Sequence, residues 1–398
     1  MLVQPLLCGA ASSQSLDDGR VINGQVQFGD VLSTNLLTVD DAVDGLELTT
    51  DATANDVLAR RSNGSLHFAS GQDFNGYAAA TSSTYVAGRV RQPYDVLTTA
   101  TGNTATAGSR NGETTGESTQ TIGPGGGALA AAYNGVDGAA GKVIIDANAI
   151  GNTQGWSALR GRIGTNTVQK NSGFTEAKAE AELWRAGDVE LYAVAAANNV
   201  TADAILSDVD MAVSQTSDGE GARAVADSHA YDVGAVFSSA EASGNSIDVA
   251  ADGGRAGLIG DQTNTAPVIA ESKISAKFFD YAEANAFGVG NSAVLSNVGP
   301  KTEIGNRQVN TAGVTARAIV EGGTGNDVVA NATASGNLVS GYACTECGGV
   351  LSADSSQINT GGVSAVTSTS LSRGRVRSVS GAASAVGNSA TFMVQSGN

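Results

Sequence analysis

The stretch Ala334-Ser-Gly-Asn337-Leu-Val, followed by Gln357-Ile-Asn359-Thr, contains two amide residues that recur along almost the whole chain. The asparagine recurs at steps of 48, 49, 47, 46, 46, 46 and 51 residues, and a glutamine recurs beside it at steps of 46–49 residues. Repeats of this length predict a solenoid, a propeller or an array. The markers are Asn55, Asn103, Asn152, Asn199, Asn245, Asn291, Asn337 and Asn388, with Gln25, Gln72, Gln120, Gln169, Gln215, Gln262, Gln308 and Gln357.

Small apolar and small polar residues alternate between these markers, as in residues 363–369 and 376–385. Such alternation predicts half-buried strands, about four in each repeat. Most of the marker asparagines follow glycine, and Gly-Asn fits a tight two-residue turn because both residues tolerate positive φ. Residues 175–184 have helical propensity, but they also alternate with period two, and we expect a strand there.

The sequence therefore predicts an all-β fold, a β-solenoid of about eight repeats of ~47 residues, each with more than one rung. An eight-bladed β-propeller is the alternative, because four strands and this repeat length also suit a blade. We favour the solenoid because aromatic residues make up 5% of the chain and cannot supply bulky packing between blades. We expect residues 1–20 to be an N-terminal lead-in, a possible remnant of a signal peptide, and residues 21–398 to form one continuous array.

The net charge of −17 limits the partners of the protein. A nucleic acid or an anionic membrane surface requires a basic stripe, and the chain has none. Anionic glycans are disfavoured for the same reason, so we expect neutral or cationic sugars, or proteins. No apolar run reaches the length of a transmembrane helix, so we expect no transmembrane segment.

The sequence offers no recognisable catalytic, cofactor-binding or metal-binding cluster. His67 and His229 are far apart, and neither has a nucleophile and an orienting carboxylate at a recognisable spacing. The aromatic residues are scattered, and no repeat stands out by its density of charged groups. These observations predict a protein that is not an enzyme and uses no cofactor. We expect the marker amides to hydrogen-bond from one repeat to the next and to set the shape of the array.

Cys344 and Cys347 lie in the longest asparagine-to-glutamine interval, which has 20 residues instead of 16 or 17. We interpret them as a possible disulfide that closes a protruding loop, with free thiols as the alternative. A zinc site would need two further soft ligands, and none repeats nearby.

The C-terminal part of the chain resembles the holdfast anchor protein D family of stalked alphaproteobacteria. The residues that carry the resemblance are Ala334-Ser-Gly-Asn-Leu-Val-Ser-Gly-Tyr342-Ala-Cys344-Thr-Glu-Cys347-Gly-Gly-Val350-Leu, Gln357-Ile-Asn359-Thr-Gly-Gly and Ser384-Ala-Val-Gly-Asn388-Ser-Ala-Thr-Phe392. The rest of the chain is similar in its Ala, Thr, Gly and Asn content.

This resemblance implies an exported, non-enzymatic anchor or adhesin component at the cell surface or outer membrane, at the cell pole. It would attach an adhesive polysaccharide, the holdfast, to the outer envelope. The implied partners are an amyloid-like anchor subunit and a curli-secretion-like outer-membrane lipoprotein. The alternative is a β-helix protein that binds or cleaves a polysaccharide.

Overall fold

The computed structural model describes residues 19–395 apart from 42–44, 92, 345–348 and 373–374. These residues form strands and no helix, so the all-β prediction is confirmed. The strands are β1 (Arg20–Gln27), β2 (Val31–Val39), β3 (Leu46–Arg61), β4 (Leu66–Phe74), β5 (Tyr77–Val86), β6 (Tyr94–Arg110), β7 (Glu113–Ile122), β8 (Gly127–Leu159), β9 (Arg162–Asn171), β10 (Phe174–Ile205), β11 (Asp208–Ser217), β12 (Gly221–Asp252), β13 (Arg255–Asn264), β14 (Val268–Val298), β15 (Lys301–Asn310), β16 (Val314–Thr324), β17 (Asp327–Cys344), β18 (Val350–Asn359), β19 (Val363–Leu371) and β20 (Ser378–Gln395).

Each strand pairs in parallel with the equivalent strand one repeat later. Gln25 of β1 is opposite Gln72 of β4, and Asn103 of β6 is opposite Asn152 of β8. One repeat is therefore one coil of a β-solenoid, and the expectation of more than one rung per repeat is wrong. The parallel pairing excludes the propeller over the described residues, because propeller blades are antiparallel sheets.

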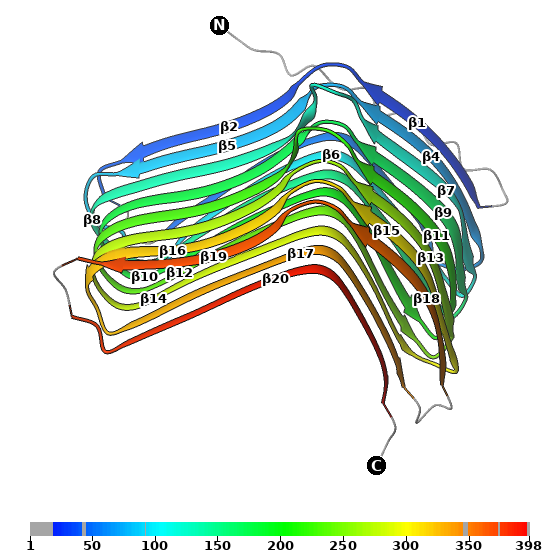
Figure 1. Cartoon of the computed structure of the whole chain (residues 1–398). Coiled ribbons are helices and arrows are strands. Elements are labelled where there is room, and N and C mark those ends of the chain that lie inside the picture. Colours follow the sequence, from blue (N-terminus) through cyan, green and yellow to red (C-terminus); the bar gives the residue numbers. More distant parts are fainter. Residues whose placement is uncertain (1–18, 42–44, 92, 345–348, 373–374, 396–398) are drawn as a thin grey trace, which may run out of the picture.

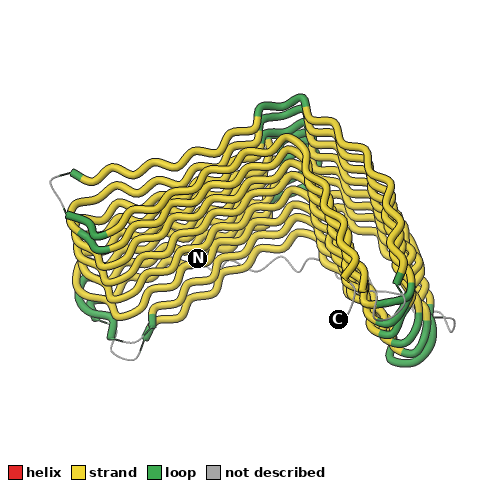
Figure 2. The backbone as a smooth tube through the Cα atoms, turned by 60° about the horizontal axis from the view of Figure 1, so that its bottom comes forward, coloured by secondary structure: helices red, strands yellow, loops and turns green. Residues whose placement is uncertain are grey.

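Each coil has two layers and is bent like a V (Figures 1 and 2). In the third coil, β7 and the first third of β8 form the outer layer, and the rest of β8 forms the inner layer. In the first arm of the V, the core lies between the two parts of β8. In the second arm, the core lies between the end of β8 and the short strands of the eight-stranded sheet. The V shape leaves an outer face over both arms and a concave inner face.

The inner strand bends at the Gly-Asn pair and does not end there. Gly102 and Asn103 lie inside β6, and the pairing with β8 skips only Gly102. The expectation of a two-residue turn at Gly-Asn is therefore wrong, and so is the count of four strands per repeat. Close approach explains the small residue at the bend: a Cβ on Gly290 would lie 2.6 Å from the carbonyl oxygen of Gly336 and 2.7 Å from Oδ1 of Asn310.

The core of the first arm consists mostly of alanine and valine, as the low aromatic content predicts. The second arm has larger side chains, and Phe68 packs edge-on against Trp156 with a centroid distance of 5.7 Å. In both arms, each core side chain stacks on the side chain at the equivalent position of the next coil. The core is therefore continuous through the middle coils, and no described residue covers it at the outer side of the first and last coils.

The segment 175–184, which has helical propensity, lies in strand β10. Its alternating side chains fit the period of a strand with one buried face, and pairing to β8 and β12 on both sides satisfies its backbone. Tertiary pairing therefore decides its structure over local propensity.

Candidate functional site

The marker asparagines form a ladder of side-chain hydrogen bonds inside the elbow of the V. In each step the Nδ2 group of one asparagine donates to Oδ1 of the next, at 2.7–2.8 Å. The same Nδ2 group also donates to a carbonyl oxygen of the short strand that begins the next coil, as from Asn103 in β6 to Thr121 in β7 at 2.9 Å. The asparagine thus links neighbouring coils and joins the two layers. The ladder consists of Asn55, Asn103, Asn152, Asn198, Asn245, Asn291, Asn337 and Asn388.

The member from the fourth coil is Asn198, so the assignment of Asn199 as a marker is wrong. Asn198 is fully buried and accepts from Asn152, whereas the side chain of Asn199 points to the opposite face of the strand. The strand period explains the error, because a shift of one residue moves a side chain to the other face. Asn198 also restores the spacing of 17 residues to Gln215, which Asn199 shortens to 16.

The marker glutamines form a second ladder next to the first. Each Nε2 group donates to Oε1 of the previous glutamine at 2.7–2.8 Å. It also donates to a carbonyl oxygen of the inner strand, as from Gln120 to Thr153 at 2.8 Å. The members are Gln25, Gln72, Gln120, Gln169, Gln215, Gln262, Gln308 and Gln357.

A third, shorter row lies two residues after the glutamines, and the sequence reading missed it. Asn264 donates to Asn310 at 2.8 Å, and Asn310 donates to Asn359 at 2.7 Å. Each also donates to a carbonyl oxygen two residues later, as from Asn264 to Ala266 at 2.9 Å. The motif Gln-x-Asn-Thr, which recurs in these three coils, is the sequence pattern that could have predicted this row.

These ladders cannot serve as a ligand site in the middle coils, because their amides are buried and hydrogen-bonded. Asn103, Asn245, Gln120 and Gln262 have no exposed surface. Their bonds satisfy polar groups that would otherwise be buried without partners, and this fixes the register of the coils. A functional surface has to lie on the outside of the solenoid or at its ends.

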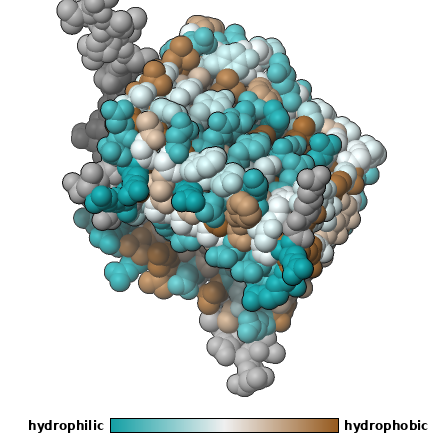
Figure 3. Space-filling view, turned by 90° about the vertical axis from the view of Figure 1, so that its left-hand side faces the viewer, coloured by the Kyte–Doolittle hydropathy of each residue, from teal (hydrophilic) through white to brown (hydrophobic). Residues whose placement is uncertain are grey.

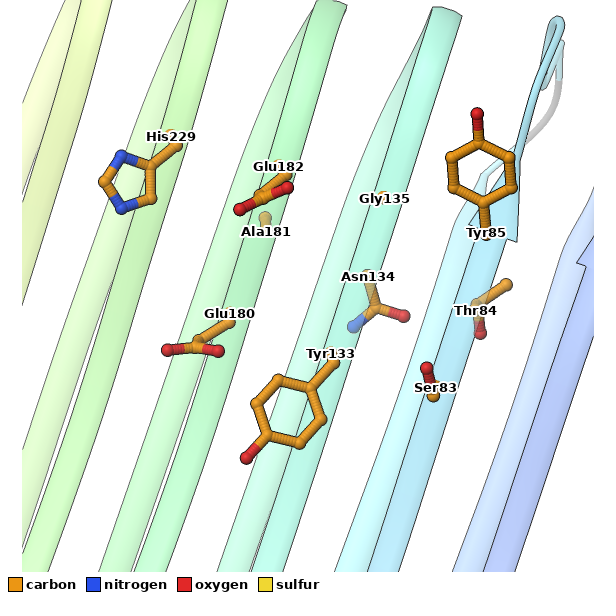
Figure 4. A pocket seen from close by; sticks show the side chains of 10 residues that line it. All are labelled: Ser83, Thr84, Tyr85, Tyr133, Asn134, Gly135, Glu180, Ala181, Glu182 and His229. Carbon is orange, nitrogen blue, oxygen red and sulfur yellow. The ribbon is translucent and has the colours of Figure 1, made fainter.

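A groove on the outer face of the first arm is the best candidate for such a surface (Figure 4). Tyr85, Tyr133, Glu180, Glu182 and His229 project outward from four neighbouring strands, β5, β8, β10 and β12. They border a hollow of about 350 Å³. A second hollow of about 410 Å³ shares Glu182 and His229 and extends toward the tip of the arm. We call these two adjoining hollows the aromatic groove.

The tip of the arm adds a stack of aromatic rings to the groove. Trp184 and Tyr231 are stacked with a centroid distance of 4.2 Å and an interplanar angle of 8°. Phe278 contacts Tyr231 edge-on at 5.6 Å, and the ammonium group of Lys277 lies 4.7 Å from the Tyr231 ring centre. Trp184 is 51% exposed. Three consecutive coils thus place aromatic rings along one line, with Trp184 and Phe278 exposed and Tyr231 half-buried between them.

Charged groups lie beside the other two aromatic rings of the groove, Tyr85 and Tyr133. Tyr85 donates a hydrogen bond to the carboxylate of Asp137, and this bond raises the pKa of the Tyr85 hydroxyl. The ammonium group of Lys178 lies 2.7 Å from the Glu180 carboxylate and 5.2 Å from the Tyr133 ring centre. Rings next to carboxylates offer apolar contact together with hydrogen-bond acceptors, which is the usual character of a binding site for a polar organic ligand.

The sequence contained a signal for this groove. Trp184, Tyr231 and Phe278 are separated by 47 and 47 residues, the period of the repeat. The interpretation of the aromatic residues as scattered is therefore wrong for this group. His229, for which the sequence indicates no catalytic partners, lies in the groove, whereas His67 lies on the outer face of the second arm, with Nδ1 3.3 Å from Oγ1 of Thr115.

The surface at the tip of the first arm is polar or intermediate in character, with hydrophobic side chains in small separate patches (Figure 3). The described residues contain no group of three His, Cys, Asp or Glu side chains that could hold a metal ion. Within the same residues there is also no helix long and apolar enough to cross a membrane.

The possible disulfide falls partly outside the described residues. Cys344 ends β17 and is half-buried, while Cys347 lies in the segment that is not described. The pairing stays a prediction. Residues 1–18, which include most of the expected lead-in, also lie outside the described part.

Comparison with known proteins identifies the family of this chain. No curated protein and no solved structure matches it. The family model of holdfast attachment protein D matches residues 40–313, which is more than half of the chain. The match includes the aromatic groove and lies N-terminal to residues 334–392, on which the sequence resemblance was based. The chain therefore belongs to the holdfast attachment protein D family.

Proposed function

We propose that the protein is a non-enzymatic anchor at the cell surface that holds an adhesive polysaccharide along its aromatic groove and attaches it to the outer envelope. Membership of the holdfast attachment family supports a role in attachment. The row of Trp184, Tyr231 and Phe278 beside the groove, in which Trp184 and Phe278 are exposed, is the observation that carries the finer proposal.

The chemistry of the groove suits a sugar chain. Exposed aromatic rings pack against the apolar faces of pyranose rings, and carboxylates such as Glu182 accept hydrogen bonds from hydroxyl groups. The rings recur once per coil, so they form a row that an extended polymer can follow. The net charge of −17 favours neutral or cationic sugars over anionic ones.

Tryptophan fluorescence of the full chain provides a direct test. The chain has two tryptophans; Trp184 is 51% exposed and Trp156 is 2% exposed, so a sugar that binds the groove should change the signal of Trp184 alone. The probes are a neutral polysaccharide (dextran), a cationic one (chitosan) and an anionic one (alginate). We expect a saturable change with a neutral or cationic probe and none with alginate.

Substitutions locate the binding site. Replacing Trp184 removes the fluorescent reporter. Binding by the variants is therefore measured as slower migration in a native gel that contains the polysaccharide. Trp184→Ala and Tyr231→Ala should abolish the retardation. Tyr192→Ala is the matched control, because Tyr192 is 39% exposed but lies on the concave face. Equal loss in all three variants, or no binding by the native chain, would contradict the proposal.

A hydrolysis assay separates the anchor from the alternative of a polysaccharide-cleaving β-helix. We expect no new reducing ends after prolonged incubation of the purified protein with the polysaccharide that binds. Release of reducing ends that is lost in a Glu182→Gln variant would overturn the non-enzymatic proposal.

The implied export to the outer membrane and the partners, an amyloid-like subunit and a curli-secretion-like lipoprotein, belong to the same proposal. The open strand edges of the first and last coils support it, because an edge strand can accept a strand from another protein.

A further inference from the structure

The two ends of the solenoid carry complementary hydrogen-bonding groups, with a donor at one end where the other end has an acceptor. In the glutamine ladder, donation runs from each coil to the previous one, so Oε1 of Gln357 in the last coil accepts no hydrogen bond from the part of the chain that the structure describes. Gln25 in the first coil donates from Nε2 only to the carbonyl oxygen of Asp56, which leaves its second N–H group available. A donor at one end thus matches an acceptor at the other.

The asparagine ladder runs in the opposite direction and gives the same match. Each asparagine donates to the next coil, so Asn388 in the last coil has an N–H group with no ladder partner. Oδ1 of Asn55 in the first coil accepts no hydrogen bond from any described residue. The orientation of both amides is fixed, because each Nδ2 group also faces a backbone carbonyl oxygen.

The backbone and the core are open at both ends as well. Within the described residues, β1 pairs only with β4 and β18 pairs only with β15, so no described strand pairs with the other edge of either one. Apolar side chains that face the core are only partly covered there, with Val379 52% exposed, Phe392 37% exposed and Val394 50% exposed in the last coil. An uncovered core and an unpaired parallel edge favour the addition of another coil.

Charge favours a contact between opposite ends over a contact between like ends. Residues 20–65 of the first coil contain seven acidic and three basic residues. Residues 350–395 of the last coil contain one acidic and three basic residues. The first coil is therefore net negative and the last coil is net positive.

We propose that copies of this chain stack head to tail, with the last coil of one copy against the first coil of the next, so that both amide ladders, the parallel sheets and the core continue through the junction. The ladders set the register. Gln357 lies opposite Gln25 of the next copy, and Asn388 lies opposite its Asn55. The product is a straight fibre in which every copy has the same orientation, and it extends the aromatic groove periodically along the fibre.

Disulfide trapping tests this register. Gly24→Cys and Ser356→Cys place thiols on exposed outward positions that face each other across the proposed junction, and a Cβ on Gly24 meets no atom within 4 Å. Within one chain these positions are separated by about seven coil spacings, roughly 34 Å, which a disulfide cannot span. The three native cysteines are replaced by serine. Oxidation of the full chain should convert monomer into a ladder of covalent multimers on a non-reducing gel.

The matched control is Gly24→Cys with Ser352→Cys, which is exposed on the same strand but four residues, or about 13 Å, out of register. It should give little multimer under the same conditions. Chains with one introduced cysteine should give at most dimers. Equal cross-linking in the two double variants, or a monomer that does not associate at any concentration in light scattering, would overturn the proposal.

Discussion

Asn198 illustrates how much one side chain holds together in this fold. Its amide contacts Asn152 and Asn245 in the neighbouring coils and the carbonyl oxygen of Thr216 in the short strand of the next coil. Removing it takes the acceptor from one N–H group of Asn152 and the side-chain donor from Oδ1 of Asn245 and from the Thr216 carbonyl oxygen. A buried group that loses its partner typically destabilises a protein by about 1–3 kcal/mol.

We therefore predict that Asn198→Ala lowers the free energy of unfolding by at least about 2 kcal/mol. Asn199→Ala is the matched control, since no side-chain hydrogen bond from Asn199 is part of the ladder, and it should stay within about 0.5 kcal/mol of the native chain. Guanidinium unfolding followed by circular dichroism measures both. A larger effect at Asn199 than at Asn198 would show that the ladder has been assigned to the wrong residue.

The cysteines provide a second prediction at the residue scale. We expect Cys344 and Cys347 to be disulfide-bonded in the exported protein, because their interval has residues to spare compared with the other coils. A thiol titration of denatured, unreduced protein should then detect Cys8 alone. Detection of three thiols would reject the bond.

The amide markers could be found from the sequence because their spacing repeats and their chemistry has a single role. Asn198 was missed because two adjacent asparagines stand at this point, and the flanking glycine is replaced by Ala197. The constant interval to the next glutamine was the better criterion. It reflects the geometry of the coil, whereas a flanking glycine reflects only the space at the bend.

At the scale of the elements, the long inner strands were the hardest feature to predict. Strands in globular proteins usually contain about 3–10 residues, and β8 contains 33. The long runs of alternating apolar and polar residues therefore led to a prediction of several shorter strands, with Gly-Asn as a turn between them. The continuous strand is possible because a neighbour on each side pairs its backbone over nearly its whole length.

The attachment of the last coil depends partly on an ion pair. Arg377 contacts Asp327 at the start of β17, with Nε 3.1 Å from Oδ1, and Ser378 donates to the same carboxylate at 2.6 Å. The Arg377 guanidinium, followed by the Ser378 hydroxyl, lowers the pKa of Asp327 below its ordinary value of 3.8. A folded-state pKa below the unfolded value contributes stability above the unfolded pKa, and this contribution is lost as the pH falls through the folded pKa.

We predict that Arg377→Ala increases amide hydrogen exchange in β20 at pH 7 and that the difference from the native chain shrinks below about pH 4. Hydrogen exchange at a series of pH values, corrected for intrinsic rates, measures this. Arg307→Ala is a suitable control, because Arg307 lies on β15 and pairs with Asp261 at 3.0 Å, so it contacts neither β17 nor β20 through this ion pair. The same difference at pH 3 as at pH 7 would mean that the ion pair does not contribute.

At the scale of the whole molecule, the sequence predicted the solenoid but not the aromatic groove. The solenoid follows from the repeat alone. The groove depends on which residues become neighbours when coils with slightly different lengths stack, and Tyr133, Glu182 and His229 meet only after the register is known. Residues that differ from coil to coil carry the specific surface, whereas residues that repeat carry the shape.

The stability of the molecule should decrease from the middle toward the ends. Each coil of a solenoid contacts only its neighbours, so the first and last coils have one interface and the inner coils have two. The buried pattern of β10 and the largely exposed pattern of β20 agree with this difference. Strands with one neighbour open at a lower free energy than strands with two.

We therefore predict a gradient of hydrogen exchange in dilute solution. Amides of β8, β10, β12 and β14 should exchange slowest, and amides of β1, β2, β19 and β20 should exchange fastest. Raising the protein concentration should slow exchange at both ends together, because head-to-tail stacking gives each end coil its second neighbour. High salt should reverse this slowing by screening the attraction between the oppositely charged ends. Exchange mass spectrometry measures each region in one experiment. Protection that rises at one end only would instead indicate contact between like ends, and uniform exchange along the chain would show that the coils unfold as a single unit.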